Sequence, residues 1–351
     1  MNRRTADFDA SFPGRSSPMI RLPDPVGPIT EWLFGQLVGG TSPAVPSVAS
    51  DDPLGDLDFQ LALYVACELH YGGVAGCPDE LEWEPRISAL RSELQDQMLS
   101  ALQSTCGVLG RIEPEDVPAR IFALIETDDA PPLSRYIETQ ADLEQFREFV
   151  MHRSAYQLKE ADPHSFAIAR IGPPAKSAMV EIQADEYGGG DAERMHSVLF
   201  AKTMTELGLE TAHGAYVGRL PASTLATINL ITLFGLRRRW RGALVGHLAG
   251  FEITSPQPNR RYANGLRRLG FGPAATDFYD EHVEADSVHE NIAAYDLAGG
   301  LARQEPELAG DIIFGVSALL LCERRFAAHI LDSWTAGMSS LREERPALLP
   351  V

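Results

Sequence analysis

From Leu57 onward, apolar residues recur every three or four positions, and few stretches alternate between polar and apolar residues as β-strands do. This spacing places the apolar residues on one face of an α-helix. We therefore predict an all-α protein. The predicted helices span residues 56–71, 85–107, 114–126, 139–161, 173–187, 191–208, 221–234, 236–254, 257–270, 274–300 and 308–338.

The first 55 residues differ from the rest because they hold eight of the 24 prolines. Proline lacks a backbone N–H and interrupts helices. We expect a partly disordered extension over 1–55, in which residues 29–38 form one or two helical turns that dock onto the body. The stretch DDAPP at 128–132 is the predicted boundary between an N-terminal helical region at 56–132, which covers the other domain or forms a dimer interface, and a C-terminal helical domain at 133–345.

The charge balance limits the partners of the chain. It has 30 Lys and Arg against 49 Asp and Glu, a formal net charge of −19. Such a surface disfavours nucleic acid and anionic membranes. No apolar run approaches the roughly 20 residues that span a bilayer, and no apolar stretch follows the N-terminal arginines as in a secretory signal. The four cysteines form no close pair, so we expect reduced thiols and a cytoplasmic protein.

Three candidate metal ligands lie in one predicted helix. In FYDEHVEADSVHE, at 278–290, His282, Asp286 and His289 are spaced i, i+4 and i+7. These positions fall within roughly 60° of arc on a helix, so two imidazoles and a carboxylate can reach one metal ion. The alternative is an acidic, solvated helix face with two incidental histidines.

A second pair flanks a predicted chain reversal. In DEYGGGDAERMH, at 185–196, Glu186 ends one predicted helix and His196 lies in the next. The three intervening glycines permit a sharp turn that brings the two helices together. The alternative is an ordinary glycine-terminated helix with a surface glutamate.

Two further glutamates lie in apolar surroundings. Glu252 follows a stripe of glycines at 242, 246 and 250, which suggests that another helix or a substrate approaches that backbone closely. We expect His247, on the same helix, to lie mostly in the core. Glu160 ends an apolar-striped helix, and its alternative role is a surface charge paired with Lys159 or Arg153.

Four stretches together resemble the haem-oxygenase-like diiron oxidases, also called iron-containing redox enzymes. They are HRSAYQLKEADPHSFAIARI, AKSAMVEIQADEYGGGDAERMH, GHLAGFEITS and FYDEHVEADSVHE. The resemblance covers roughly 140–340 and implies a haem-oxygenase-like helical bundle in which seven side chains hold two irons. Here the seven would be Glu160, Glu186, His196, Glu252, His282, Asp286 and His289. Glu68 is a reserve candidate, because its distance from Glu186 does not fit the pattern that Glu160 fits.

The charges of this set suit two ferrous ions. Four carboxylates total −4, and two Fe(II) supply +4, whereas four converging carboxylates without metal would repel one another and tend to protonate. Mixed carboxylate and imidazole ligands suit Fe(II) or Mn(II). The spacings E-x9-H and H-x3-D-x2-H differ from the paired Glu-x-x-His motifs of ferritin-like proteins.

Groups next to the ligands in sequence are candidates for a supporting role. A ligating histidine needs a partner for its other ring nitrogen, which Asp162, Asp185 or Glu290 could supply. Three tyrosines either hydrogen-bond near the ligands or simply pack; they are Tyr156, Tyr187 and Tyr279.

The resemblance implies an O₂-dependent oxidase or oxygenase that acts on a small metabolite, with N-hydroxylation of an amine or guanidine in secondary metabolism ranked first. A desaturase or C–C lyase acting on an aliphatic or amino acid is one alternative, and a non-redox metal-binding helical protein is another. A haem-handling protein would leave the carboxylates unexplained. We further expect two irons that cycle between Fe(II) and Fe(III) and an external electron donor. We also expect a homodimer and a redox partner protein.

Overall fold

The computed structural model describes residues 19–40, 44–107 and 110–343. Over these ranges the protein is all-α, as predicted, and its only β-type pairing is an isolated bridge between Ile20 and Val74. None of the described helices has both the length and the apolar content that a bilayer crossing would require. The first 18 residues of the proline-rich stretch lie outside the described residues.

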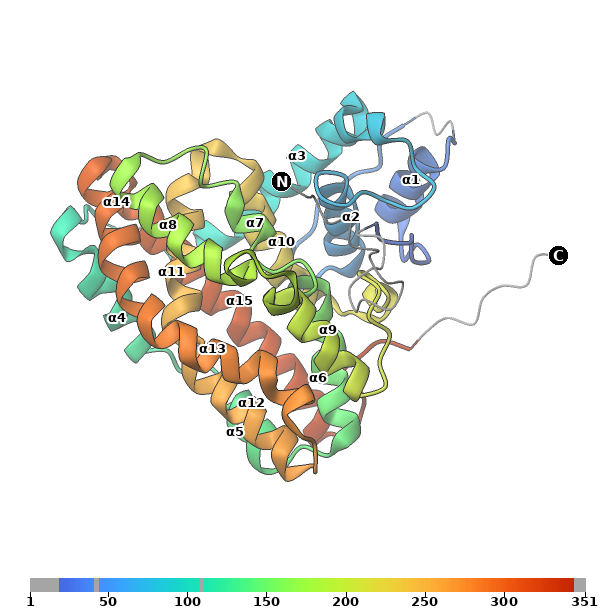
Figure 1. The fold of residues 1–351 in the computed structure, drawn as a ribbon. Helices are drawn as coiled ribbons and strands as arrows, with labels where there is room; N and C mark the ends of the chain where they lie inside the picture. Colours follow the sequence, from blue (N-terminus) through green and yellow to red (C-terminus); the bar gives the residue numbers. More distant parts are fainter. Residues whose placement is uncertain (1–18, 41–43, 108–109, 344–351) are drawn as a thin grey trace, which may run out of the picture.

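The helices alternate with short turns along the chain (Figure 1). The α-helices are α1 (Pro28–Leu37), α2 (Leu57–Glu68), α3 (Pro85–Cys106), α4 (Val117–Glu126), α5 (Leu133–Thr139), α6 (Leu143–Gln157), α7 (Asp162–Ser165), α8 (Pro173–Glu186), α9 (His196–Glu206), α10 (Ala222–Leu236), α11 (Arg241–Thr254), α12 (Pro256–Arg268), α13 (Pro273–Asn291), α14 (Gly299–Gln304) and α15 (Ala309–Thr335). A π-helical segment, η7 (Ile292–Ala298), joins α13 to α14.

The N-terminal helices pack against the larger bundle. In Figure 1, α1, α2 and α3 lie beside it on the upper right. Helix α1 packs on α2, α2 on α10, and α3 and α4 on α15. One apolar core includes buried residues of these N-terminal helices and of the bundle helices, among them Phe59, Leu94 and Ile231. The N-terminal helices therefore share an apolar core with the bundle.

The predicted helical turns at 29–38 form the complete helix α1. Asp58, in α2, anchors its first turn, because the carboxylate accepts hydrogen bonds from the backbone N–H groups of Ile29 (2.8 Å) and Thr30 (2.9 Å). Acceptors at a helix N-terminus satisfy N–H groups that have no partner within the helix. This contact fixes part of the proline-rich stretch to the body.

Helices α11 and α15 cross at the glycine stripe. A Cβ atom added at Gly246 would overlap the Ile312 carbonyl oxygen, and one added at Gly315 would overlap the Ala243 carbonyl oxygen. The stripe therefore admits another helix rather than a substrate. This close packing fixes the helix that carries Glu252.

Several predicted boundaries are wrong in detail. The helix predicted at 139–161 ends at Gln157, so Glu160 lies in the turn that follows it. Residues 133–139 form the separate helix α5, which we did not predict. Helix α9 begins only at His196, after a short 3₁₀ turn. The segment predicted as one helix at 274–300 is divided by the π-helical turns of η7.

Candidate metal centre

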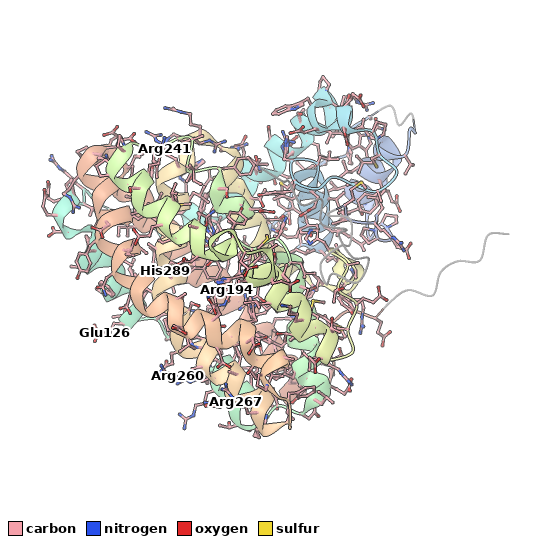
Figure 2. All side chains as sticks on the ribbon, in the orientation of Figure 1. Glu126, Arg194, Arg241, Arg260, Arg267 and His289 are labelled. Atoms are coloured by element: carbon pink, nitrogen blue, oxygen red, sulfur yellow. The ribbon has the colours of Figure 1, made fainter. Side chains whose placement is uncertain are left out.

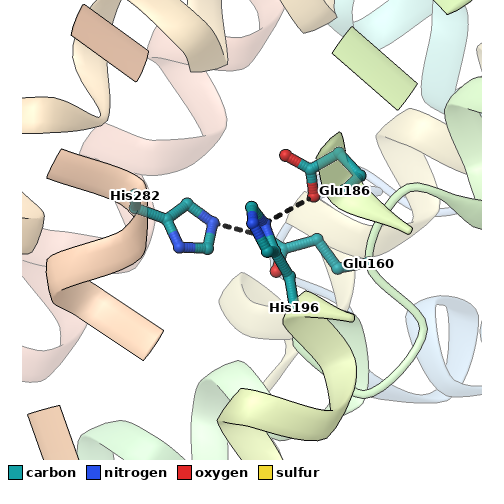
Figure 3. A group of neighbouring side chains, drawn as sticks. All are labelled: Glu160, Glu186, His196 and His282. Carbon is teal, nitrogen blue, oxygen red and sulfur yellow. Dashed lines mark ion pairs between the residues drawn. The ribbon is translucent and has the colours of Figure 1, made fainter. Parts of the chain in front are cut away.

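Four of the predicted ligands meet at one point inside the bundle. Glu160, Glu186, His196 and His282 each offer a donor atom, and these atoms all lie within 4.8 Å of one another. The four come from the turn after α6, the end of α8, the start of α9 and the middle of α13 (Figure 3). Their side chains are at most 10% exposed, so water satisfies them poorly.

The contact between His196 and Glu186 is close but poorly aligned for a hydrogen bond. Nδ1 of His196 lies 3.0 Å from Oε2 of Glu186. Both atoms are buried and have no hydrogen-bond partner in the described structure. Oε2 of Glu160 is likewise buried without a hydrogen-bond partner among the described residues. Two donor atoms that lie close together without aligning on each other are what a shared cation would require, so the observed arrangement fits a metal ion.

His282 is oriented by the backbone of its own helix. Its Nδ1 lies 2.7 Å from the carbonyl oxygen of Phe278, one turn earlier, to which it donates. Nε2 is therefore the unprotonated nitrogen of the neutral ring, and it lies 3.6 Å from Oε1 of Glu160. Metal-binding histidines are typically held in this way, with the second nitrogen donating to a carbonyl or carboxylate.

Two further predicted ligands lie beside this group. Glu252, at the end of α11, lines the same cavity as Glu160 and Glu186. Its Oε2 is 3.2 Å from Nδ1 of His289. His289 is buried, whereas Arg260 and Arg267 point outward at the edge of the body in Figure 2. Glu252 and His289 therefore form a second pair of donors near the first four.

Asp185 supports His289 from the opposite side of the ring. Its Oδ2 lies 2.9 Å from Nε2 of His289, and its side chain is 57% exposed. Of the three carboxylates considered as histidine partners, Asp162 instead accepts a hydrogen bond from the hydroxyl of Tyr187 at 2.8 Å. Asp286, the seventh predicted ligand, lies on α13, and its side chain lies outside the described part of the structure.

The alternative partners considered for Glu160 are engaged elsewhere. Lys159 pairs with Glu68, and Arg153 forms a two-pronged ion pair with Glu323 at 2.7 and 2.9 Å. Glu160 is therefore not a surface charge. Glu68 does not belong to the four-residue group, because both of its carboxylate oxygens are engaged elsewhere. One pairs with Lys159, and the other lies 3.2 Å from Nε2 of His213.

The pKa values of the two buried carboxyl groups in the four-residue group shift in opposite directions. Burial raises the pKa of Glu160, since removal from water disfavours its charged form, and His282 only partly offsets this. At Glu186 burial acts in the same direction, but the neighbouring histidines, His196 foremost, outweigh it and lower the pKa to about 2. Nearby positive charge therefore keeps the Glu186 carboxylate ionised in the interior, and a bound cation would supply the same stabilisation.

A small cavity adjoins the donors. It has a volume of about 40 Å³ and is lined by Tyr156, Glu160, Ala161, His164, Gln183, Glu186, Leu248, Phe251, Glu252, Ser255 and His282. The Tyr156 ring stacks on the Phe251 ring, with centroids 5.7 Å apart. The hydroxyl of Tyr279 is buried without a hydrogen-bond partner among the described residues, whereas the hydroxyl of Tyr187 donates to Asp162.

Sequence reasoning gave no role in this cavity to two of its polar residues, His164 and Gln183. His164 is buried, and its Nε2 lies 3.1 Å from Nδ1 of His247. Gln183, one turn before Glu186, is only 3% exposed. Both occur in stretches that supplied the resemblance, but neither has a spacing that marks it as a cavity residue.

Comparison with known proteins agrees with the geometry. The family model described as an iron-containing redox enzyme matches residues 147–324, just over half of the chain and the part that holds all seven predicted ligands. A nitrosourea synthase of Streptomyces achromogenes subsp. streptozoticus is 28% identical over 163 residues, which are 46% of this chain and 35% of the relative. The chain matches about a third of that relative's length. On this match and the buried carboxylate–imidazole cluster, the chain belongs to the iron-containing redox enzymes and is an iron-dependent oxidoreductase.

Proposed function

We propose that the protein is a non-haem diiron enzyme that uses O₂ to oxidise a small metabolite. The observation that carries this proposal is the convergence of four buried donors, two carboxylates and two imidazoles, within 4.8 Å. Carboxylate and imidazole are the donor set of non-haem iron sites that activate O₂. Such a set is costly to bury without a cation.

The donors suggest two neighbouring iron sites. Glu160, Glu186, His196 and His282 would hold one iron, and Glu252 with His289 would hold the second together with Asp286. Two ferrous ions would supply the electrons that reduce O₂, and an external donor would restore the reduced state. The protein's own part is to fix the donors and to exclude water from the cavity.

N-hydroxylation of an amine or guanidine is the reaction we rank first. The cavity is lined by carboxylates and by polar side chains such as Gln183 and His164, in addition to Leu248 and Phe251. A wholly apolar tunnel would favour an acyl chain instead. The similarity to a nitrosourea synthase, whose product contains oxidised nitrogen, supports the same ranking. The homodimer, the redox partner protein and the cytoplasmic location stay predictions.

The decisive experiment measures iron binding and O₂ reactivity together. Protein loaded anaerobically with Fe(II) should bind about two irons per chain. Mixing with O₂ in a stopped-flow instrument should give an absorbance change whose decay is accelerated by amines or guanidines. Acceleration by fatty acids alone would favour the desaturase or lyase alternative. Iron binding without O₂ consumption would favour the non-redox metal-binding protein.

A further inference from the structure

Gln183 has a buried amide beside the candidate metal centre. It lies on α8, one turn before Glu186, and it lines the cavity. Its Nε2 donates to the carbonyl oxygen of Ala161 at 2.9 Å and to Oγ of Ser165 at 2.8 Å. Both N–H groups of the amide are therefore used.

A chain of hydrogen bonds fixes the direction of this amide. The Asp162 carboxylate accepts the only hydroxyl proton of Tyr187, at 2.8 Å. Tyr187 can then only accept from Ser165, which lies 3.0 Å away, and Ser165 has the Ala161 carbonyl at 3.3 Å as its other acceptor. In either case the lone pair of Ser165 receives the proton of Gln183. Reversing the amide would place its oxygen against the Ala161 carbonyl, which can only accept.

The amide oxygen of Gln183 is consequently the end left over. Oε1 has no hydrogen-bond partner in the described structure. It is also buried, because Gln183 is only 3% exposed. A buried acceptor without a partner is unfavourable, and such groups in native proteins commonly mark a ligand site. It is also uncharged, unlike the carboxylates assigned to iron.

We propose that Oε1 of Gln183 accepts a hydrogen bond from an N–H group of the substrate and so selects amines and guanidines. The inference rests on the proposed function and specifies its substrate class. The cavity of about 40 Å³ is lined by four of the assigned iron ligands. One water needs roughly 10–15 Å³ on this measure, so the cavity would admit only the reacting end of a substrate beside the iron. A guanidinium group presents several N–H donors at once.

Methylguanidine is a suitable probe, titrated calorimetrically into the Fe(II)-loaded protein without O₂. Gln183→Met keeps the length of the side chain and removes the acceptor, so we expect its Kd to rise at least tenfold. Gln183→Glu restores an acceptor and should bring the Kd back to within threefold of the wild type. Ser177→Ala, an exposed change on the same helix, is the control and should change the Kd no more than threefold.

Tetramethylammonium, a cation without an N–H group, separates hydrogen bonding from charge and cavity shape. Its affinity should be the same for the wild type and Gln183→Met. An equal loss for both cations, or unchanged methylguanidine binding in Gln183→Met, would overturn the inference. Gln183→Met could also leave methylguanidine binding unchanged but weaken iron binding. Oε1 would then accept from an O–H donor, such as water on iron, and the inference about the substrate would again be overturned. Iron content is measured on the same samples. A wild type that binds no iron would refute the proposed function. A wild type with two irons whose Kd for methylguanidine is unchanged in Gln183→Met would refute this inference alone.

Discussion

Nδ1 of His282 donates to the carbonyl oxygen of Phe278 at 2.7 Å, which leaves Nε2 as the nitrogen directed toward Glu160. If Nε2 binds iron, His282→Ala should reduce the iron bound from about two to one or fewer per chain. The hydrogen bond within the helix is not essential for folding, so helical circular dichroism should be retained. Iron is measured by colorimetric assay after anaerobic loading and desalting.

His329→Ala is the matched control for that variant, because His329 lies on α15 and contacts the carbonyl oxygen of Ser340 rather than the four-residue group. It should retain the iron of the wild type. Full iron binding by His282→Ala would remove His282 from the site.

Asp185 should control the affinity of the second iron. Its contact with Nε2 of His289 leaves Nδ1 toward Glu252. Removal of such an outer partner typically weakens metal binding by about 10- to 100-fold. Asp185→Asn should therefore weaken one of the two iron-binding steps about tenfold, as measured by anaerobic titration. Glu181→Gln, an exposed change on the same helix, should have no effect, and equal titration curves for both variants would speak against this role.

Lys159 and Glu68 form an ion pair in the interior, with side chains only 6% and 1% exposed. Removal of one partner leaves the other charge buried, which typically costs about 3–5 kcal/mol. We expect Lys159→Met to lower the free energy of unfolding by this amount in urea titrations. The double variant Glu68→Gln with Lys159→Met should recover more than half of the loss, whereas additive losses would contradict the pairing.

The crossing of α11 and α15 should not tolerate a methyl group. Gly246→Ala places a Cβ against the Ile312 carbonyl, so we expect a loss of about 3 kcal/mol or more in the free energy of unfolding. Gly310→Ala, on α15, meets no atom within 4 Å. It should leave stability unchanged or raise it by up to about 1 kcal/mol. Thermal melts of the two variants compare them directly, and equal melting temperatures would contradict the packing.

Burial lowers the pKa of His164 to about 4, compared with about 6.5 in an unfolded chain. Between these values the unfolded state binds more protons, so stability should fall as the pH decreases from about 6.5 to about 4. The contribution of His164 is about 3 kcal/mol over this window. Urea unfolding of the metal-free protein at several pH values should show a shallower dependence for His164→Gln. Parallel curves for the two proteins would refute this assignment.

Periodicity predicted the all-α fold well because amphipathic helices dominate the chain. Helix α5 escaped prediction because it has only seven residues, too few for the pattern to repeat. The π-helical segment escaped because an apolar pattern with period 3.6 does not reveal one wider turn. Within α13 the spacing of His282 and His289 was informative because both belong to one rigid helix.

Contacts between helices could not be predicted from spacing. The partners of Lys159 and Arg153 lie 91 and 170 positions away along the chain, so the local pairs with Glu160 that we considered were wrong. The contact of Asp185 with His289 depends likewise on how α8 meets α13. His247 is buried, as expected, but its hydrogen bond to His164 required the fold.

The wide turns of η7 begin three residues after His289 and lead into α14. A π-helical stretch contains one residue more than an α-helix would use to reach the same point. A version of the chain one residue shorter here could close into regular α-helix and still connect the same two ends. Length variation in this family at 292–298 would thus leave His289 facing Glu252, so alignments of iron ligands should place gaps after this histidine and not before it.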